Sequence, residues 1–275
     1  MSARRLIVTA DDVGLHPGMT EGAIQAAEHG IVTACSVVAN GFDIDDALRR
    51  LSVLRIDTGI HLTLVEERPI SDRSEVPSLV GSRGRLFPSY RELAVRYVAG
   101  RIVIAEVERE LRAQIEKVVA AGVSITFLNG HQHLHVLPAI FQLILRLAEE
   151  FQIRYVRIPA DPVTGFSPRA GAIRALNHLG AKARKHVGES SVRTSDRTIG
   201  IVEAGHLDRA SIVRLLDSVE GLTELVCHPG IGNAAIARRY RWRYDWDSET
   251  DALCDVTIRE EIAARGIELI APRDL

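Results

Sequence analysis

Acidic and imidazole side chains stand at or near the ends of several short apolar segments of this sequence. They are Asp11, Asp12, His61, His131, His133, His135 and His228. Carboxylates and neutral imidazoles bind divalent metal ions, and both groups transfer protons in enzymes. Gathered in this way, these residue types predict a metal-dependent hydrolase.

The adjacent carboxylates of Asp11 and Asp12 allow two interpretations. One is a helix N-cap beside a solvated acid, because aspartate is favoured at N-caps. In the other, a turn at the end of a strand directs both side chains inward, although neighbours in a regular strand point to opposite faces. One carboxylate would then bind a metal ion while the other stays free as a base.

The alternating histidines His131, His133 and His135 are an unusual choice for a surface loop. In an extended segment all three would lie on one face, whereas in a turn one or two would reach the same ion. A polar loop without function is the alternative. Neutral imidazole suits zinc, iron, nickel or copper, and an added carboxylate suits a harder ion.

His61 and His228 each have a structural alternative. His61 is flanked by apolar residues in the stretch 59–62, where a lone histidine is often a core residue. His228 precedes Pro229 and Gly230, so it could simply mark the end of a strand. His61 gains weight as a functional residue because the other candidates also stand close to strand ends.

These residues can form one catalytic centre. An ion bound by Asp12, His61 and one histidine of the cluster would keep positions open for water and substrate, as catalytic metal sites do. The ion would activate water and polarise a carbonyl group. Asp11 could then accept a proton and His228 donate one, which describes the hydrolysis of an amide or an ester.

The elements that must position these residues follow from the alternation of apolar runs with helical segments. Strands are predicted over residues 6–10, 31–39, 58–64, 124–128, 154–158, 199–204, 223–227 and 267–270, and helices over 17–29, 44–54, 90–121 (split near Gly100), 138–151, 174–185, 207–219 and 251–265. Residues 66–88 and 233–248 are predicted loops. Such alternation indicates parallel strands joined by helices.

A closed or partly closed barrel explains where the polar residues stand. In a β/α barrel the carboxyl ends of the strands converge on one face, and that face holds the active site. We therefore expect an α/β fold, a distorted TIM-like (β/α) barrel of about seven parallel strands, as a single domain over residues 1–275. No GxGxxG motif follows the first strand, so a dinucleotide-binding fold has no support.

Composition restricts the classes of function further. Of 275 residues, 46% are hydrophobic and 25% are charged, and the formal net charge is -2. These values are typical of a globular domain, and they provide no strong field for nucleic acid. We therefore expect no nucleic-acid partner.

The cysteines and the amino terminus predict the compartment. Cys35, Cys227 and Cys254 are widely spaced and include no CxxC pair, which argues against a disulfide framework and a thiolate zinc site and fits a reducing cytoplasm. The first residues lack the long apolar stretch of a signal peptide. No run of about 18 apolar residues predicts a transmembrane segment. We expect a cytoplasmic protein.

Several segments resemble the motifs of the YdjC-like (ChbG-type) carbohydrate deacetylases. They are residues 9–15, similar to TADDFG with Val13 in place of Phe; 30–37, similar to GIVTSTS; 59–62, similar to a GxH element; 130–135, similar to SHHHVH; and 228–230, similar to HPG. The segments occur in the same order as in the family and cover nearly the whole chain. Each is weak alone, but together they are specific.

The resemblance implies a distorted TIM-like barrel, often a homodimer, that binds one divalent metal ion, magnesium or zinc. It also implies a metal-dependent N-deacetylase, which hydrolyses the acetamide of an N-acetylated amino sugar. By matching position, Asp12, His61 and His131 would be the metal ligands. Asp11 would be the catalytic base and His228 the catalytic acid.

The remaining candidates would surround this centre. His133 and His135 would support the ligands or face the substrate, and Asn40 is a further residue of this kind. Arg157, which ends another strand, would orient the substrate or tune Asp11, with a structural ion pair as the alternative. Many members of the family have aspartate where this chain has Asn129, so that position supplies no charge here.

Residues 129–135 are most similar to the hopanoid-biosynthesis branch of the family, HpnK. This likeness implies a lipid-linked substrate, an N-acetylglucosaminyl hopanoid, and peripheral contact with the inner membrane. Residues 238–246 intersperse arginines with tyrosine and tryptophan, a pattern that suits a membrane interface or an amphiphilic substrate. A solvated loop or a dimer contact explains the pattern equally well.

Two other functions compete with deacetylation. A metal-dependent phosphoesterase on a related barrel would need two or three ions, and therefore more carboxylate and histidine ligands. A non-catalytic carbohydrate-binding protein could retain the barrel and would bind no metal. The number of ions that the chain can hold separates these hypotheses.

Overall fold

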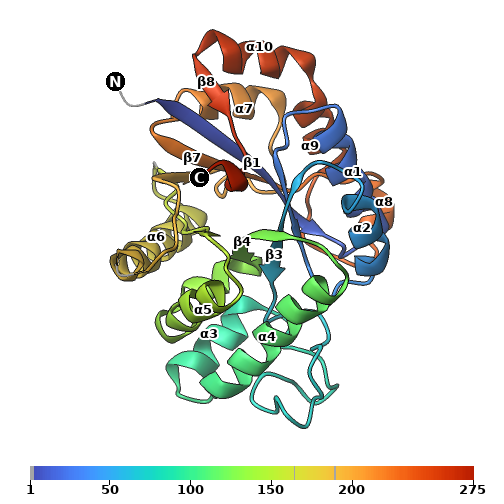
Figure 1. The fold of residues 1–275 in the computed structure, drawn as a ribbon, viewed down its shortest axis with the longest axis vertical. Helices are drawn as coiled ribbons and strands as arrows, with labels where there is room; N and C mark the ends of the chain where they lie inside the picture. Colours follow the sequence, from blue (N-terminus) through green and yellow to red (C-terminus); the bar gives the residue numbers. More distant parts are fainter. Residues whose placement is uncertain (1–2, 164, 189) are drawn as a thin grey trace.

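A curled sheet of parallel strands forms the centre of the molecule (Figure 1). The computed structural model describes residues 3–163, 165–188 and 190–275. The strands are β1 (Arg4–Val13), β2 (Ala34–Val37), β3 (Asp57–Leu62), β4 (Ile125–Gly130), β5 (Tyr155–Val156), β6 (Arg197–Ile199), β7 (Leu222–Cys227) and β8 (Ile267–Leu269). Their order is β5-β4-β3-β2-β1-β7-β6, and β8 pairs with β1. This curled half-barrel confirms the predicted α/β architecture.

Helices surround this sheet (Figure 1). They are α1 (Pro17–Glu28), α2 (Ile44–Leu51), α3 (Tyr90–Val98), α4 (Ile104–Ala120), α5 (Pro138–Glu150), α6 (Pro168–Val187), α7 (Arg209–Leu216), α8 (Asn233–Ile236), α9 (Trp246–Cys254) and α10 (Val256–Ala264), with 3-10 turns η1 (His131–Val136) and η2 (Pro272–Asp274). Side chains of Ser89 and Asp208 cap α3 and α7, as their residue types favour. None of the helices described is long and apolar enough to cross a membrane.

The sheet changes from apolar to polar along its strands. Ile7, Phe127 and Tyr155 belong to one buried apolar cluster. Two positions further along the chain from these residues stand Thr9 and Asn129, on the same faces of β1 and β4, and Arg157, directly after β5; all three are buried. The polar side chains thus gather toward the carboxyl ends of the strands, the end of the barrel where we expected the site.

Several predicted boundaries are wrong for identifiable reasons. The strand predicted at 199–204 is instead β6, and it ends before Gly200, whose φ of 91° is incompatible with an extended strand. The helix predicted at 251–265 is two helices, because Asp255 adopts an extended conformation and caps α10. The predicted loop 233–248 contains α8 and the start of α9. The predicted break near Gly100 is confirmed between α3 and α4.

Candidate active site

A bulge in β1 directs Asp12 into the site. In the ladder between β1 and β2, Ala10 pairs with Cys35 and Val13 with Val37, so three steps along β1 match two along β2. Asp12 has a φ of 65°, a left-handed conformation that aspartate adopts more readily than most residues. Because a bulge re-aims side chains, Asp11 and Asp12 can both serve one site. The strand runs through both residues instead of ending before them, so the N-cap interpretation is wrong.

Asp12, His61 and His131 bring potential metal-ligand atoms together. One such atom from each residue lies within 4.8 Å of the other two. Asp12 Oδ1 is 2.9 Å from His131 Nδ1 and 3.4 Å from His61 Nε2, and the two nitrogens are 3.3 Å apart. All three residues are buried. They come from β1, from β3 and from the turn after β4, so strand ends converge as predicted.

The amide of Asn129 orients His61. Asn129 Oδ1 lies 2.8 Å from His61 Nδ1 and also accepts a hydrogen bond from Ser36 Oγ at 2.6 Å. An imidazole that donates from Nδ1 keeps a lone pair on Nε2. That Nε2 is the atom facing Asp12 and His131. The neutral residue at position 129 therefore prepares His61 as a ligand.

His131 lies between two carboxylates. Its Nδ1 faces Asp12, and its Nε2 is 3.2 Å from Glu66 Oε2. Burial lowers the pKa of His131, but Asp12 and Glu66 together raise it to about 10. In the ion-free protein this imidazole is therefore protonated, and its positive charge stands in the place where a bound metal ion would supply positive charge.

Asp11 points to the interior, against Arg157. The guanidinium donates to Asp11 Oδ2 at 2.5 Å and to Oδ1 at 3.0 Å, and Asn129 Nδ2 donates to Oδ1 at 3.0 Å. Burial raises the pKa of Asp11, but Arg157 and His61 lower it to about 2, so this carboxylate stays ionised. The Arg157 side chain is 0% exposed. Of the roles considered for it, contact with Asp11 fits this geometry and contact with substrate does not.

A second carboxylate shares the charge of Arg157. Its Nε donates to Glu224 Oε1 at 2.9 Å. Glu224 also accepts hydrogen bonds from Thr9 Oγ1 at 2.7 Å and from the Tyr155 hydroxyl at 2.6 Å. One buried cation therefore lies between two buried anions, in a network that joins β1, β5 and β7.

The histidine cluster is a turn, and its members do different things. Gln132 and His133 have φ values of 51° and 55°, so the histidines do not share an extended face. His135 Nε2 donates to the Arg157 carbonyl at 2.8 Å, and this hydrogen bond helps to fix the backbone of Arg157. His133 packs with its ring centroid 6.3 Å from that of His135. Of the three histidines, His131 joins the potential metal ligands.

His228 follows β7 and has a carboxyl group beside it. Its backbone N–H donates to Glu249 Oε1 at 2.5 Å, and its Nδ1 is 3.9 Å from the same oxygen. Burial lowers the pKa of His228 below its ordinary value, and the opposing effect of Asp12 and Asp11 is smaller. Burial also raises the pKa of Glu249 to about 8, so this carboxyl carries a proton at neutral pH.

Aromatic residues of the segment 238–246 form a wall beside His131 and His228. The wall consists of Tyr240, Trp242, Tyr244 and Trp246, whose rings contact one another in sequence. The centroid of Trp242 lies 5.4 Å from that of His131, and Tyr244 lies 5.4 Å from His228. The arginines between these aromatics are exposed. The alternation in sequence therefore separates an inner aromatic face from an outer basic face.

Asn40 ties two loops together at the rim. Its Nδ2 donates to the Arg68 carbonyl at 2.9 Å, which joins the loop after β2 to the long loop 66–88.

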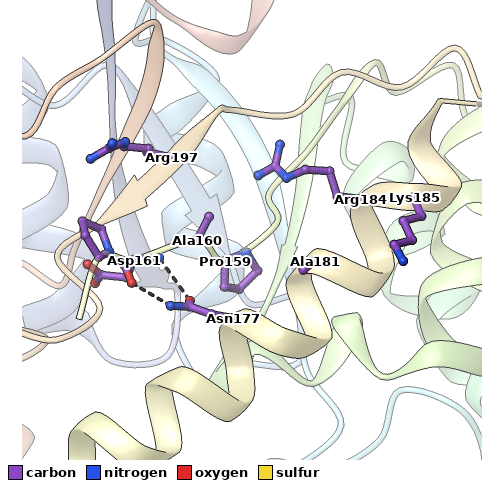
Figure 2. Close-up of a pocket in the computed structure, with 9 residues that line it drawn as sticks. Pro159, Ala160, Asp161, Asn177, Ala181, Arg184, Lys185 and Arg197 are labelled. Atoms are coloured by element: carbon purple, nitrogen blue, oxygen red, sulfur yellow. Dashed lines mark hydrogen bonds between the residues drawn. The ribbon is translucent and has the colours of Figure 1, made fainter. Parts of the chain in front are cut away.

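A cavity of about 470 Å³ lies away from these candidate residues, between α6 and the segment after β5. Figure 2 shows this cavity, with Asp161, Asn177 and Arg184 around it. Its lining includes none of the candidate catalytic or metal-binding residues.

Three carboxylates that contact candidate residues were not expected from the sequence. Glu66, Glu224 and Glu249 were not singled out, although each lies against a candidate residue. Glu224 sits within a strand, and a charged residue in a buried strand is a usable signal. Glu66 lies in a loop without periodicity, so its contact with His131 had no signal in the sequence.

Known proteins match this chain over nearly its whole length. A family model described as "YdjC-like protein" matches residues 5–264. A carbohydrate deacetylase from Mus musculus is 30% identical, covering 98% of this chain and 94% of that relative. A carbohydrate deacetylase from Geobacillus stearothermophilus is also 30% identical, with 98% of each covered. A chitooligosaccharide deacetylase from Serratia marcescens is 29% identical, again with 98% of each covered.

Solved structures share the fold. A protein from Enterococcus faecalis V583, described as a "putative cellobiose-phosphate cleavage protein", has a TM-score of 0.78, is 25% identical and covers 99% of each chain. An uncharacterized protein from Agrobacterium tumefaciens C58 has a TM-score of 0.52 and is 13% identical, with 100% of this chain and 90% of that chain covered. At that identity the second likeness concerns the fold alone.

Proposed function

The chain belongs to the YdjC-like protein family, and we propose that it is a carbohydrate deacetylase, a hydrolase that acts on carbon–nitrogen bonds. We propose further that it is metal-dependent and removes the acetyl group of an N-acetylated amino sugar. The observation that carries this proposal is the buried group of Asp12, His61 and His131 with the ionised Asp11 beside it.

The donor atoms of this group fit a divalent ion. His61 Nε2 and His131 Nδ1 face the same carboxylate and each other at 3.3 Å, so they need a proton or a cation between them. Two imidazoles and a carboxylate suit Zn²⁺ better than Mg²⁺, which prefers oxygen ligands. Within the described residues one such group is present. That number favours a single-ion deacetylase over a phosphoesterase with two or three ions.

Asp11 is the proposed base. A divalent ion, when bound, supplies Lewis acidity to the acetamide carbonyl and to the attacking water. A carboxylate has about four lone-pair positions, and Arg157 and Asn129 fill three of them on Asp11. The fourth, on Oδ2, is free to accept a proton. Arg157 keeps Asp11 ionised and fixes the direction of that lone pair.

His228 is the proposed acid for the departing amine. It follows β7, which pairs with β1 so that Cys227 lies beside Ala10, and it therefore stands at the strand end next to Asp11 and Asp12. Glu249 stands behind it and carries a proton at neutral pH. This arrangement, on a different strand from His61 and His131, supports proton donation to the departing amine.

The aromatic wall supports a sugar substrate. Trp242 and Tyr244 contact His131 and His228, the two sides of the proposed centre. Flat aromatic faces suit the apolar face of a sugar ring, and their polar edges remain free for hydrogen bonds. We propose that His133 also faces the substrate and that Asn40 shapes the rim.

We propose an N-acetylglucosaminyl hopanoid as the lipid-linked substrate, reached by peripheral contact of a homodimer with the cytoplasmic side of the inner membrane. Exposed side chains at the carboxyl end of the barrel support this proposal. Arg238, Arg241 and Arg243 are exposed beside the aromatic wall. Phe42, on the loop after β2, is 70% exposed. Cationic and apolar side chains together suit an anionic lipid surface.

The activity is tested by acetate release. Protein loaded with Zn²⁺ and incubated with N-acetylglucosaminyl oligosaccharides or an N-acetylglucosaminyl hopanoid is expected to release acetate, and a chelator should abolish the release until Zn²⁺ is restored. Acetate from none of these substrates, with the ion bound, would remove the deacetylase proposal. A protein that binds no ion would point to a non-catalytic carbohydrate-binding function.

Membrane contact is tested with vesicles. Replacing Arg238, Arg241 and Arg243 with glutamine should weaken binding to phosphatidylglycerol vesicles by about 100-fold at low salt, because each cation near such a surface contributes about 1 kcal/mol. Co-sedimentation measures the binding.

The matched control replaces Arg101, Arg109 and Arg146, which lie on or beside α4 and α5, with glutamine. That variant should bind vesicles as the unmodified protein does. Equal losses in both variants would show a non-specific effect of charge and would remove the membrane proposal.

A further inference from the structure

Glu66 occupies the point where three segments of the site rim meet. Its Oε2 is 3.2 Å from His131 Nε2. Its Oε1 accepts hydrogen bonds from Trp242 Nε1 at 3.3 Å and from Gln132 Nε2 at 3.2 Å. The loop after β3, the turn after β4 and the segment after β7 are therefore joined through one carboxylate.

The backbone of Glu66 is held in an uncommon conformation by hydrogen bonds on both sides. Glu66 has a φ of 67°, which is uncommon outside glycine. Its N–H donates to the Phe87 carbonyl at 2.7 Å, and its own carbonyl accepts from Arg85 at 2.7 Å. A non-glycine residue keeps such a conformation where its surroundings over-determine it, and these conformations cluster at functional sites.

The contact with His131 selects one form of its ring. An imidazole binds a metal ion through a nitrogen that carries no proton, and the hydrogen bond at the other nitrogen decides which one that is. His131 Nδ1 faces Asp12 Oδ1 and His61 Nε2. A carboxylate that accepts from Nε2–H keeps the proton on that nitrogen, so Nδ1 is the nitrogen that gives up its proton when an ion binds.

We propose that Glu66 is a positioning residue of the metal centre, which holds His131 in the Nε2–H form and connects that ligand to Trp242 of the aromatic wall. This inference rests on the metal-dependent function proposed above. It makes the rim sensitive to the ion, because Glu66 contacts both His131 and the Trp242 indole, in addition to the direct packing of the two rings at 5.4 Å.

Replacing Glu66 with glutamine is the direct test. The amide has one acceptor oxygen, so it satisfies either His131 or the Trp242 and Gln132 donors, whereas Glu66 satisfies them all. Affinity for Zn²⁺, measured by calorimetric titration, should fall about 10–100-fold, as for other residues that orient metal ligands. The unfolding temperature of the ion-free variant shows that it folds.

Glu67→Gln is the matched control. Glu67 is the neighbouring residue, and its carboxylate binds the Tyr240 hydroxyl at 2.9 Å and Arg239 at 3.2 Å. The affinity of Glu67→Gln for Zn²⁺ should be within about twofold of that of the unmodified protein. Glu66→Gln with unchanged affinity, or an equal loss in both variants, would overturn the assignment.

Tryptophan emission provides a second test that does not require Glu66→Gln to fold. The chain has two tryptophans, Trp242 and Trp246, and Trp242 is the one bonded to Glu66. Zn²⁺ should change the emission of the unmodified protein, and Trp242→Phe should lose that change while keeping its affinity. A full change in Trp242→Phe would contradict the proposed connection.

The two proposals fail in different ways. An unmodified protein that binds no ion removes both. Zinc-dependent acetate release with equal Zn²⁺ affinity in Glu66→Gln removes the role of Glu66 alone.

Discussion

Replacing Asp11 with asparagine is expected to reduce kcat for acetate release by about 10³-fold, within the range of general-base catalysis, and to leave metal binding intact. The amide has nearly the same shape, but it cannot accept a proton from water at neutral pH. Asp12, His61 and His131 are untouched by the change. The measurement is kcat together with the Zn²⁺ content of the purified variant.

A second buried carboxylate provides the control for this experiment. Asp161 is 2% exposed and accepts a hydrogen bond from the Val202 N–H, in the cavity that lies away from the centre. Asp161→Asn should keep kcat within about threefold of the unmodified enzyme. Near-normal turnover in Asp11→Asn would remove Asp11 as the base, and loss of zinc from that variant would place it among the ligands.

Replacing Arg157 with methionine is expected to lower the free energy of unfolding by about 3–5 kcal/mol at pH 7, because two buried carboxylates lose their shared cation. Asp11 and Glu224 are both buried and both bonded to Arg157. Urea unfolding of the ion-free protein measures the loss. Adding Glu224→Gln to Arg157→Met should recover part of it, since one of the unpaired charges is removed.

The loss in the free energy of unfolding caused by Arg157→Met should be smaller in acid. In the unmodified protein the pKa of Asp11 is about 2, below its ordinary value of 3.8, so this group stabilises the fold above about pH 4 and loses that effect as the pH falls toward 2. Without Arg157, burial raises the pKa instead, and protonation then relieves the variant. A penalty as large at pH 4 as at pH 7 would contradict this account.

An exposed arginine serves as the control for Arg157. The side chain of Arg146 is 60% exposed and pairs with Glu108 at 3.3 Å. Exposed ion pairs contribute little to stability, so Arg146→Met should change the free energy of unfolding by about 0.5 kcal/mol or less. An equal loss in the two variants would show that burial of the charge is not the cause.

The sequence was sufficient to predict that these side chains gather, because the carboxyl ends of barrel strands converge on one face, although the choice of His131 within its cluster came from the family resemblance. Asp12, His61 and His131 follow this rule, and the structure brings them within 4.8 Å of one another. The bulge that turns Asp12 inward was not predictable as such, since one extra residue in a ladder depends on the register of the neighbouring strand.

The residues that sequence reasoning did not find depend on contacts between loops. Glu66 reaches Trp242, which is 176 residues away, and no local pattern encodes such a contact. Asn129 was considered only as a missing charge, whereas its amide orients both His61 and Asp11. Likewise, the broken helix at Asp255 depends on a capping conformation that periodicity alone does not reveal.

The buried network around Arg157 also has a consequence for how the chain folds. Its hydrogen bonds join residues separated by 146 positions in the case of Asp11 and by 215 in the case of Thr9 and Glu224. Contacts of such long sequence separation form slowly, because the entropy of loop closure is lost before any bond rewards it. A nascent chain therefore lacks Glu224 until β7 has been made. The pairing of Arg157 with both Asp11 and Glu224 is completed only after β7 has been synthesised.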